Sequence, residues 1–198
     1  MKTLSINQLH LEILGCRKCG LCKTRIHAVP GQGPSNARIL FIGEAPGKKE
    51  DEKGFPFVGK AGKFLDELLA SIHLQREDIF ITNIVKCRPP SNRDPLPEEI
   101  LNCGPYLDKQ IHEIQPKVIC PLGRFSAQYV LEKFGFEWTS ITQVAGQKFS
   151  RSIFPKGTGR ICQVTIVTLF HPCVAIYDGK KKPLLVEHFK QLKNILEG

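Results

Sequence analysis

Four short apolar runs divide the chain, and each has the length of a buried strand. They span residues 37–43 (ARILFIG), 79–85 (IFITNIV), 117–122 (KVICPL) and 164–169 (VTIVTL). Continuous apolar runs of four to eight residues are typical of strands that are covered on both faces of a sheet. The pattern therefore predicts four buried strands.

The segments between these runs carry apolar residues at helical spacing. From Gly62, one helical face carries Phe64, Leu65, Leu68, Leu69 and Ile72. Further helices are predicted for residues 4–14, from Pro97 onward, for 125–134 and for 184–196. Residues 48–61 are predicted to form a mobile charged connection, and 135–160 a loop or short hairpin.

Strands that alternate with helices indicate an α/β fold. We expect a three-layer α/β/α sandwich with a central, mainly parallel, four-stranded sheet. The length of 198 residues suits one domain, so residues 1–198 are treated as a single unit.

Polar residues follow three of the predicted strands. Glu44, Asn83 and His171 each lie at or just after the end of an apolar run. In parallel sheets, ligands bind beyond the carboxyl ends of the strands. The sequence therefore predicts that these side chains gather at one edge of the sheet and form an active site.

The formal net charge is +9, which favours a polyanionic partner such as a nucleic acid. A basic surface without a ligand fits the charge about equally well. No apolar run approaches the roughly 20 residues that cross a membrane, and the amino-terminus is too polar for a secretion signal. We therefore expect a cytoplasmic protein without a membrane partner.

Eight cysteines are many for a cytoplasmic chain, where disulfides are rare. Cys16 and Cys19 have the spacing of a metal-binding pair, and fifteen residues separate Cys87 from Cys103. Four thiolates suit an iron–sulfur cluster or a structural zinc ion. Zinc ribbons usually have two tight pairs, so the irregular spacing favours a cluster, with Cys22 as a competitor for Cys19.

The other three cysteines have weaker signals. Cys120 and Cys162 lie in or beside predicted strands and are expected to be small core residues. Cys173 lies two residues after His171, but no third member of a nucleophilic group accompanies this pair.

Six motifs, taken in order, resemble the family 4 uracil-DNA glycosylases. They are Cys16-Arg-Lys-Cys19, Gly43-Glu-Ala-Pro-Gly47, Gly54-Phe-Pro-Phe-Val-Gly59, Thr82-Asn-Ile-Val-Lys-Cys-Arg-Pro-Pro-Ser-Asn-Arg93, Cys103-Gly-Pro-Tyr-Leu and His171-Pro172. The resemblance implies an α/β/α sandwich and a [4Fe–4S] cluster on Cys16, Cys19, Cys87 and Cys103. It also implies an enzyme of base excision repair that hydrolyses the N-glycosidic bond of uracil and leaves an abasic site in DNA.

The resemblance assigns base recognition to two residues. The carboxamide of Asn83 would accept from uracil N3–H and donate to O4, whereas cytosine presents the reversed pattern. Phe57 would stack on the flipped base. Without the resemblance, Asn83 could instead cap a strand end, and Phe57 would be read as a core residue.

Further residues are assigned to the chemistry. His171 would donate to uracil O2 as negative charge builds there. Gly43 and Ala45 belong to a loop whose N–H groups lie near the base. Glu44 would hold this loop or favour positive charge on the sugar.

Two assignments concern water and the C5 edge of uracil. Better-known uracil-DNA glycosylases have an aspartate at the position of Ala45, so Asn92 would orient the water here. Glu50 resembles a residue that lines the C5 side of uracil, although a solvated acid fits its charged surroundings equally well.

DNA contacts are expected after His171 and near Arg93. The family often continues with an Arg-Asn-Pro segment, which this chain lacks, so the wedge is assigned to Val174, Ala175 or Ile176. Lys180, Lys181 and Lys182 would hold phosphates. The expected substrate is uracil-containing DNA, single- or double-stranded, and the expected state is a monomer.

Other functions fit less of the sequence. A zinc- or cluster-bearing DNA-binding module would explain the charge and the cysteines but not the polar residues at the strand ends. A thymine-mismatch glycosylase or a uracil cross-linking relative would share the sheet, but residues 89–97 lack the reactive histidine of the cross-linkers. A nucleotide hydrolase is disfavoured because the Gly43–Gly47 turn lacks the Lys-Ser/Thr of a P-loop.

Overall fold

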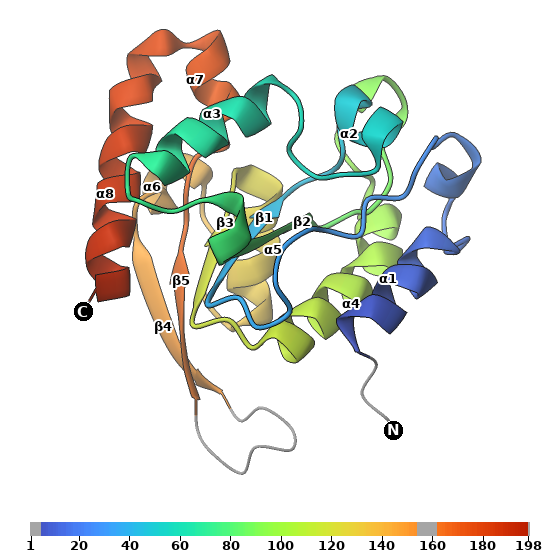
Figure 1. Cartoon of the computed structure of the whole chain (residues 1–198), viewed down its shortest axis with the longest axis horizontal. Coiled ribbons are helices and arrows are strands. Elements are labelled where there is room, and N and C mark those ends of the chain that lie inside the picture. Colours follow the sequence, from blue (N-terminus) through green and yellow to red (C-terminus); the bar gives the residue numbers. More distant parts are fainter. Residues whose placement is uncertain (1–4, 154–161, 198) are drawn as a thin grey trace.

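The computed structural model describes residues 5–153 and 162–197 and contains a five-stranded sheet (Figure 1). The strands are β1 (Ile39–Gly43), β2 (Ile79–Asn83), β3 (Val118–Pro121), β4 (Lys148–Ile153) and β5 (Cys162–Val167), in the order β2-β1-β3-β5-β4. The pairs β1–β2, β1–β3 and β3–β5 are parallel, and β4 runs antiparallel to β5. The predicted α/β class with a mainly parallel sheet is confirmed.

The predicted count of four strands was one too low. The missed strand is β4, which lies in the segment predicted as a loop or short hairpin. It sits at the edge of the sheet, and its sequence KFSRSI is largely polar. Its side chains at positions 148 and 150–152 are exposed, so its sequence lacks the apolar run that marks the four buried strands, which include β2 at the other edge.

Eight α-helices surround the sheet within the described residues (Figure 1). They are α1 (Ile6–Leu14), α2 (Lys48–Lys53), α3 (Lys60–Ala70), α4 (Pro97–Ile114), α5 (Arg124–Lys133), α6 (Ile141–Val144), α7 (Cys173–Tyr177) and α8 (Lys182–Glu197). Four 3-10 turns complete the described elements: η1 (Gly20–Lys23), η2 (Arg76–Asp78), η3 (Pro90–Asn92) and η4 (Gly179–Lys181). None of the helices in the described part of the chain is long and apolar enough to cross a membrane.

Helix α2 forms where the charge pattern predicted a mobile connection. Acidic residues in its first turn complement the helix dipole, and Gly54 ends it with a φ of 75°. The carboxylate of Asp51 accepts from the N–H of Ile26 at 2.9 Å and of His27 at 3.3 Å. This buried aspartate ties the helix to a distant loop, a contact that periodicity cannot reveal.

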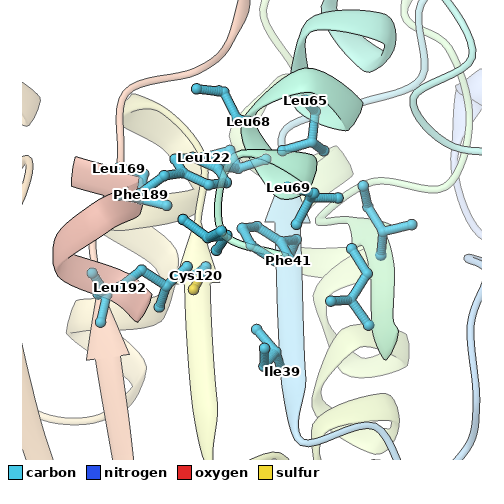
Figure 2. Packing of buried hydrophobic residues seen from close by; sticks show 14 of the residues in the cluster. Ile39, Phe41, Leu65, Leu68, Leu69, Cys120, Leu122, Leu169, Phe189 and Leu192 are labelled. Atoms are coloured by element: carbon cyan, nitrogen blue, oxygen red, sulfur yellow. The ribbon is translucent and has the colours of Figure 1, made fainter. Parts of the chain in front are cut away.

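The strands bury alternate side chains on opposite faces of the sheet. Ile39 and Phe41 of β1 pack under α3 and α8, together with Leu65, Leu68, Leu69, Phe189 and Leu192 (Figure 2). Leu40 and Ile42 pack on the other face, beneath α4 and α5. Each fully buried side chain of this size contributes about 1.5–3 kcal/mol, so both helical layers are held firmly on the sheet.

A third apolar cluster lies beside the sheet rather than on it. Leu9 and Ile13 of α1 pack with Tyr106 of α4 and with the buried Cys87 and Cys103. The amino-terminal helix is therefore attached through the cysteine-rich region.

Candidate active site

The ends of β1 and β2 bring Gly43 and Asn83 together. The two residues are partners in the parallel register, and Asn83 is buried. A Cβ atom added to Gly43 would collide with Asn83 Oδ1 and would lie 2.7 Å from Cζ of Phe57. Glycine is therefore required here so that a side-chain amide and an aromatic ring can both approach the strand end.

Phe57 lies in a strained turn that hydrogen bonds and close packing hold in place. Its φ is 53°, in the left-handed region. Arg76 donates to the carbonyl oxygens of Pro56, at 3.1 Å, and of Phe57. Gly62 of α3 lies so close to the Phe57 carbonyl that a Cβ there would collide with it. Arg76 was not among the predicted site residues, because its hydrogen bonds reach a turn 19 residues away in the chain.

Glu50 holds the next part of the same turn. Its Oε1 accepts from the N–H groups of Val58 at 2.9 Å and Gly59 at 2.8 Å, at the start of α3. The carboxylate thus complements the positive end of the helix dipole. Glu50 is more than a solvated acid, and its position beside uracil stays a prediction.

His171 follows β5 and faces Phe57. The two ring centroids are 5.7 Å apart and the ring planes meet at 30°. A Cβ on Gly123, whose φ is 92°, would lie 3.0 Å from His171 Cβ, so this glycine also permits a close approach.

The protonation of His171 follows from its surroundings. The main-chain N–H of Cys173 donates to Nδ1 at 3.2 Å, which leaves Nε2 to carry the proton of the neutral ring. Burial lowers the pKa of His171 to about 4. At neutral pH the residue is therefore an uncharged imidazole with an N–H donor at Nε2.

Glu44 lies in the loop after β1, which backbone hydrogen bonds hold against the segment after β2. The N–H of Val85 donates to the Glu44 carbonyl at 3.1 Å. Burial raises the pKa of the Glu44 carboxyl to about 7; the charge of Asp94 adds to this shift and that of Arg124 opposes it. Glu44 therefore changes charge near neutral pH.

Asn92 and Arg93 are exposed, whereas Asn83 and Phe57 are buried. Asn92 is exposed on η3, and its Oδ1 accepts from Arg88 Nε at 2.7 Å. The guanidinium of Arg93 forms two hydrogen bonds with the buried Glu99, at 2.7 and 2.9 Å. Arg93 thus holds the start of α4. A phosphate that binds Arg93 would compete with the Glu99 carboxylate for the guanidinium.

Five cysteines line one cavity between α1, η1, the segment after β2 and α4. They are Cys16, Cys19, Cys22, Cys87 and Cys103. All five are free thiols. Arg25 Nη1 donates to Cys87 Sγ at 3.0 Å, and the N–H of Lys86 donates to Cys103 Sγ at 3.2 Å. Sequence reasoning missed Arg25, although its position near the Cys16–Cys22 segment was a usable signal.

The three expected wedge residues all lie on α7. Ala175 packs against the apolar core of the α3 and α8 layer, whereas Ile176 is exposed. Tyr177, which sequence reasoning did not select, is 89% exposed at the end of the same helix. Val174 is half-buried.

The lysines after α7 differ in their contacts. Lys182 pairs with Glu67 at 3.3 Å, and Lys181 lies over the ring of Phe170 at 5.6 Å. Lys180 is exposed. A groove between α3 and α7 is lined by Lys60, Lys63, Phe64, Glu67, Ala175, Ile176 and Lys182.

Comparison with known proteins decides the family. The model of the uracil DNA glycosylase superfamily matches residues 30–193. The chain is 46% identical to the type-4 uracil-DNA glycosylase of Archaeoglobus fulgidus over 188 residues, which are 95% of this chain and 92% of that protein. It is 43% identical to the type-4 enzyme of Sulfurisphaera tokodaii over 192 residues, 96% of this chain and 84% of that protein. The chain belongs to the type-4 uracil-DNA glycosylases.

Membership in this family establishes the activity. The protein is a uracil-DNA glycosylase, a hydrolase that excises uracil from DNA during DNA repair. The family assignment made from the six motifs is confirmed, and the reading as a non-enzymatic DNA-binding module is wrong.

Proposed function

We propose that this glycosylase binds the flipped uracil between Asn83, Phe57 and His171, at the carboxyl ends of β1, β2 and β5. The observation that carries the proposal is that these three side chains, from three separate segments, lie close together. Asn83 and Phe57 both approach Gly43, and the ring of His171 lies 5.7 Å from the ring of Phe57. A set of polar and aromatic groups at this edge suits a flat heterocycle with a polar rim.

In this arrangement, Asn83 reads the identity of the base. Its carboxamide accepts from uracil N3–H and donates to O4, while Phe57 stacks on the ring. Cytosine would leave both amide groups mispaired, which costs about 1–3 kcal/mol for each buried group. Gly43 and Ala45 offer backbone groups nearby, and Glu50 supports the turn that carries Phe57.

The chemistry is assigned to His171 and Glu44, with Asn92 as the residue that orients water. As the N-glycosidic bond breaks, negative charge grows on uracil O2 and positive charge grows on the sugar. The neutral His171 donates from Nε2 to O2, and the Glu44 carboxylate favours the sugar cation. Asn92 would act from the exposed turn that Arg88 holds.

The cysteine cavity is proposed to hold a [4Fe–4S] cluster on Cys16, Cys19, Cys87 and Cys103. Four or more thiols around one cavity match the ligands of such clusters, and the N–H groups of Arg25 and Lys86 already point at two of the sulfurs. In the described residues, no three Cys, His, Asp or Glu side chains come close enough to enclose a single ion. When bound, the cluster would cross-link α1, η1, the segment after β2 and α4.

DNA is proposed to lie across α7 and η4. Ile176 is the most exposed of the three wedge candidates, and Lys180 to Lys182 would contact phosphates. Arg93 would also contact a phosphate, and it would share its guanidinium between that phosphate and Glu99. Action on single- or double-stranded DNA, function as a monomer, a single domain and a cytoplasmic location stay predictions from the sequence.

Two measurements test this assignment. A duplex with a single uracil is incubated with the protein and treated with alkali, which breaks the strand at abasic sites. We expect Asn83→Asp to lose most activity on uracil and to gain measurable activity on cytosine, because it replaces an amide donor with an acceptor. The exposed Asn194→Asp serves as the matched control. Full uracil activity in Asn83→Asp would refute the role in base reading.

Metal analysis tests the cofactor. Protein purified without oxygen should contain about four iron and four sulfide ions per chain if the cluster is bound. Stoichiometric zinc without sulfide would refute the cluster and leave the glycosylase activity assignment intact.

A further inference from the structure

The side chain of one lysine is buried between Asn83, the proposed base reader, and the cysteine cavity. Lys86 is 1% exposed. Its Nζ donates to the main-chain oxygen of Asn83 at 2.5 Å, to Thr82 Oγ1 at 2.7 Å and to Gln110 Oε1 at 2.7 Å. The three hydrogens of an ammonium group are thereby matched by three acceptors.

The acceptors are themselves held in place. Thr82 Oγ1 donates to the carbonyl oxygen of Pro30 at 2.8 Å, and Gln110 Nε2 donates to the same oxygen at 2.7 Å. Thr82 and Asn83 belong to β2, Gln110 to α4, and Pro30 to the segment before β1. The Lys86 ammonium therefore sits in a network that joins three parts of the fold, all of them buried.

Stability alone is a poor explanation for this lysine. A buried charge without an ion pair carries a large desolvation cost, and an apolar side chain of similar length would fill the same space without it. Burial lowers the pKa of Lys86 to about 7 against the attraction of Cys103 and Asp108, and no carboxylate is paired with Lys86 in the described part of the chain. What an apolar substitute could not supply is the set of directed hydrogen bonds that fixes the peptide of Asn83.

The other end of the same residue touches the cysteines. The main-chain N–H of Lys86 donates to Cys103 Sγ at 3.2 Å, and Cys87 is the next residue. The position of the Lys86 backbone is thus set at the cysteine cavity, while its side chain acts on Asn83. Lys86 therefore contacts both regions directly.

We propose that Lys86 is a positioning residue for base recognition, which fixes the Asn83 peptide so that its carboxamide meets the edge of uracil. The proposal rests on the proposed role of Asn83 as the base reader. It goes further by naming the group that orients this amide and by giving the cysteine region a direct structural connection to selectivity. A small displacement of a recognition group is enough to cost about 100-fold in rate.

The test is a double-mutant cycle between Lys86→Met and Asn83→Ala. Methionine keeps an unbranched side chain of similar length and removes all three donors. The rate of uracil release is measured in single-turnover reactions, and inhibition by free uracil is measured alongside. Iron content and binding to DNA with a stable abasic analogue report whether the fold and the DNA surface remain intact. Lys109→Met, which removes an exposed lysine from α4, is the matched control.

We expect Lys86→Met to lower the rate at least tenfold and to weaken inhibition by uracil by a similar factor, with iron content and DNA binding unchanged. In the Asn83→Ala background the same substitution should change the rate less than twofold, because the amide it orients is gone. An equal loss in both backgrounds would overturn the proposal. Wild-type rates in Asn83→Ala would instead refute base reading by Asn83, and the positioning role with it.

A second pair of variants covers the case in which Lys86→Met does not fold. Thr82→Val removes one acceptor of the ammonium group, and Thr82→Ser keeps it. We expect Thr82→Val to lose several-fold in rate and in uracil inhibition, and Thr82→Ser to stay near wild type. Equal behaviour of the two variants would also overturn the proposal.

Discussion

The ring of Phe57 lies 5.7 Å from the ring of His171, although 113 residues separate them in the chain. Phe57 is held by the turn before α3, and His171 by the loop between β5 and α7. In the proposed arrangement, the base stacks on Phe57 and accepts from Nε2 of His171, so this contact would bring base binding and charge stabilisation together.

Replacing Gly43 by alanine should disable the site without unfolding the protein. The added methyl group would collide with the Asn83 amide and approach Phe57 Cζ to 2.7 Å, so both groups must move. We expect a loss of about 100-fold in the rate of uracil release, measured in single-turnover reactions. Gly15→Ala is the control, because its new Cβ has ordinary contacts, the nearest at 3.7 Å. Equal rates for the two variants would show that the close approach at Gly43 is unimportant.

The pH dependence of the reaction should follow Glu44. Its pKa is raised to about 7, and the carboxylate is the form that favours a sugar cation. The rate should therefore rise as pH increases through about 7 and level off above it. Glu44→Gln should remove this rise and give a flat, lower profile. A profile of Glu44→Gln that still rises near pH 7 would assign the ionisation to another group.

His171 should act as a hydrogen-bond donor, and its own ionisation should not change the rate near neutral pH. Its pKa is lowered to about 4, so the ring is uncharged throughout the range above pH 5. Removing one donor to a developing anion costs about 10²–10³ in rate, and we expect a loss of this size for His171→Ala. Binding to DNA with an abasic analogue, measured by anisotropy, should stay within about twofold. A loss confined to DNA binding would contradict the assigned role.

The cysteine variants should separate ligands from neighbours. Cys16, Cys19, Cys87 and Cys103 are the proposed ligands, and Cys22 lines the same cavity. We expect Cys19→Ser to lower the iron content and the visible absorbance sharply, and Cys22→Ser to retain both. The reverse result would make Cys22 the ligand, which was the competing assignment.

The lysines after α7 should control the salt dependence of DNA binding. Each phosphate contact contributes about one unit to the slope of log K against log salt. Lys180→Ala and Lys181→Ala should each reduce the slope by about one, and Lys182→Ala by less, because Lys182 already pairs with Glu67. Lys117→Ala, at the opposite end of the sheet, should leave the slope unchanged. An effect as large for Lys117 would indicate diffuse attraction instead of a defined surface.

Local patterns were sufficient for the four buried strands β1, β2, β3 and β5, for the helices α3, α4, α5 and α8, and for the gathering of Asn83 and His171 at one edge. Buried strands and amphipathic helices are encoded over short windows, and parallel strands align their carboxyl ends. The ordered motifs were also sufficient for the family and the reaction. Edge strand β4 and helix α2 were missed because their sequences are largely polar and their neighbours decide their structure.

Only the tertiary structure decided how the site is held. The sequence alone determined which residue types were available: an amide after one strand, an imidazole after another, and a set of cysteines. The contact of Gly43 with Asn83, the support of Phe57 by Arg76 and the bonds from Lys86 to Thr82 and Gln110 all join distant segments. A hydrogen bond between distant segments leaves no periodic signal in either segment. The desolvation cost of its polar groups and the energy of the bond itself arise only when both segments are buried together.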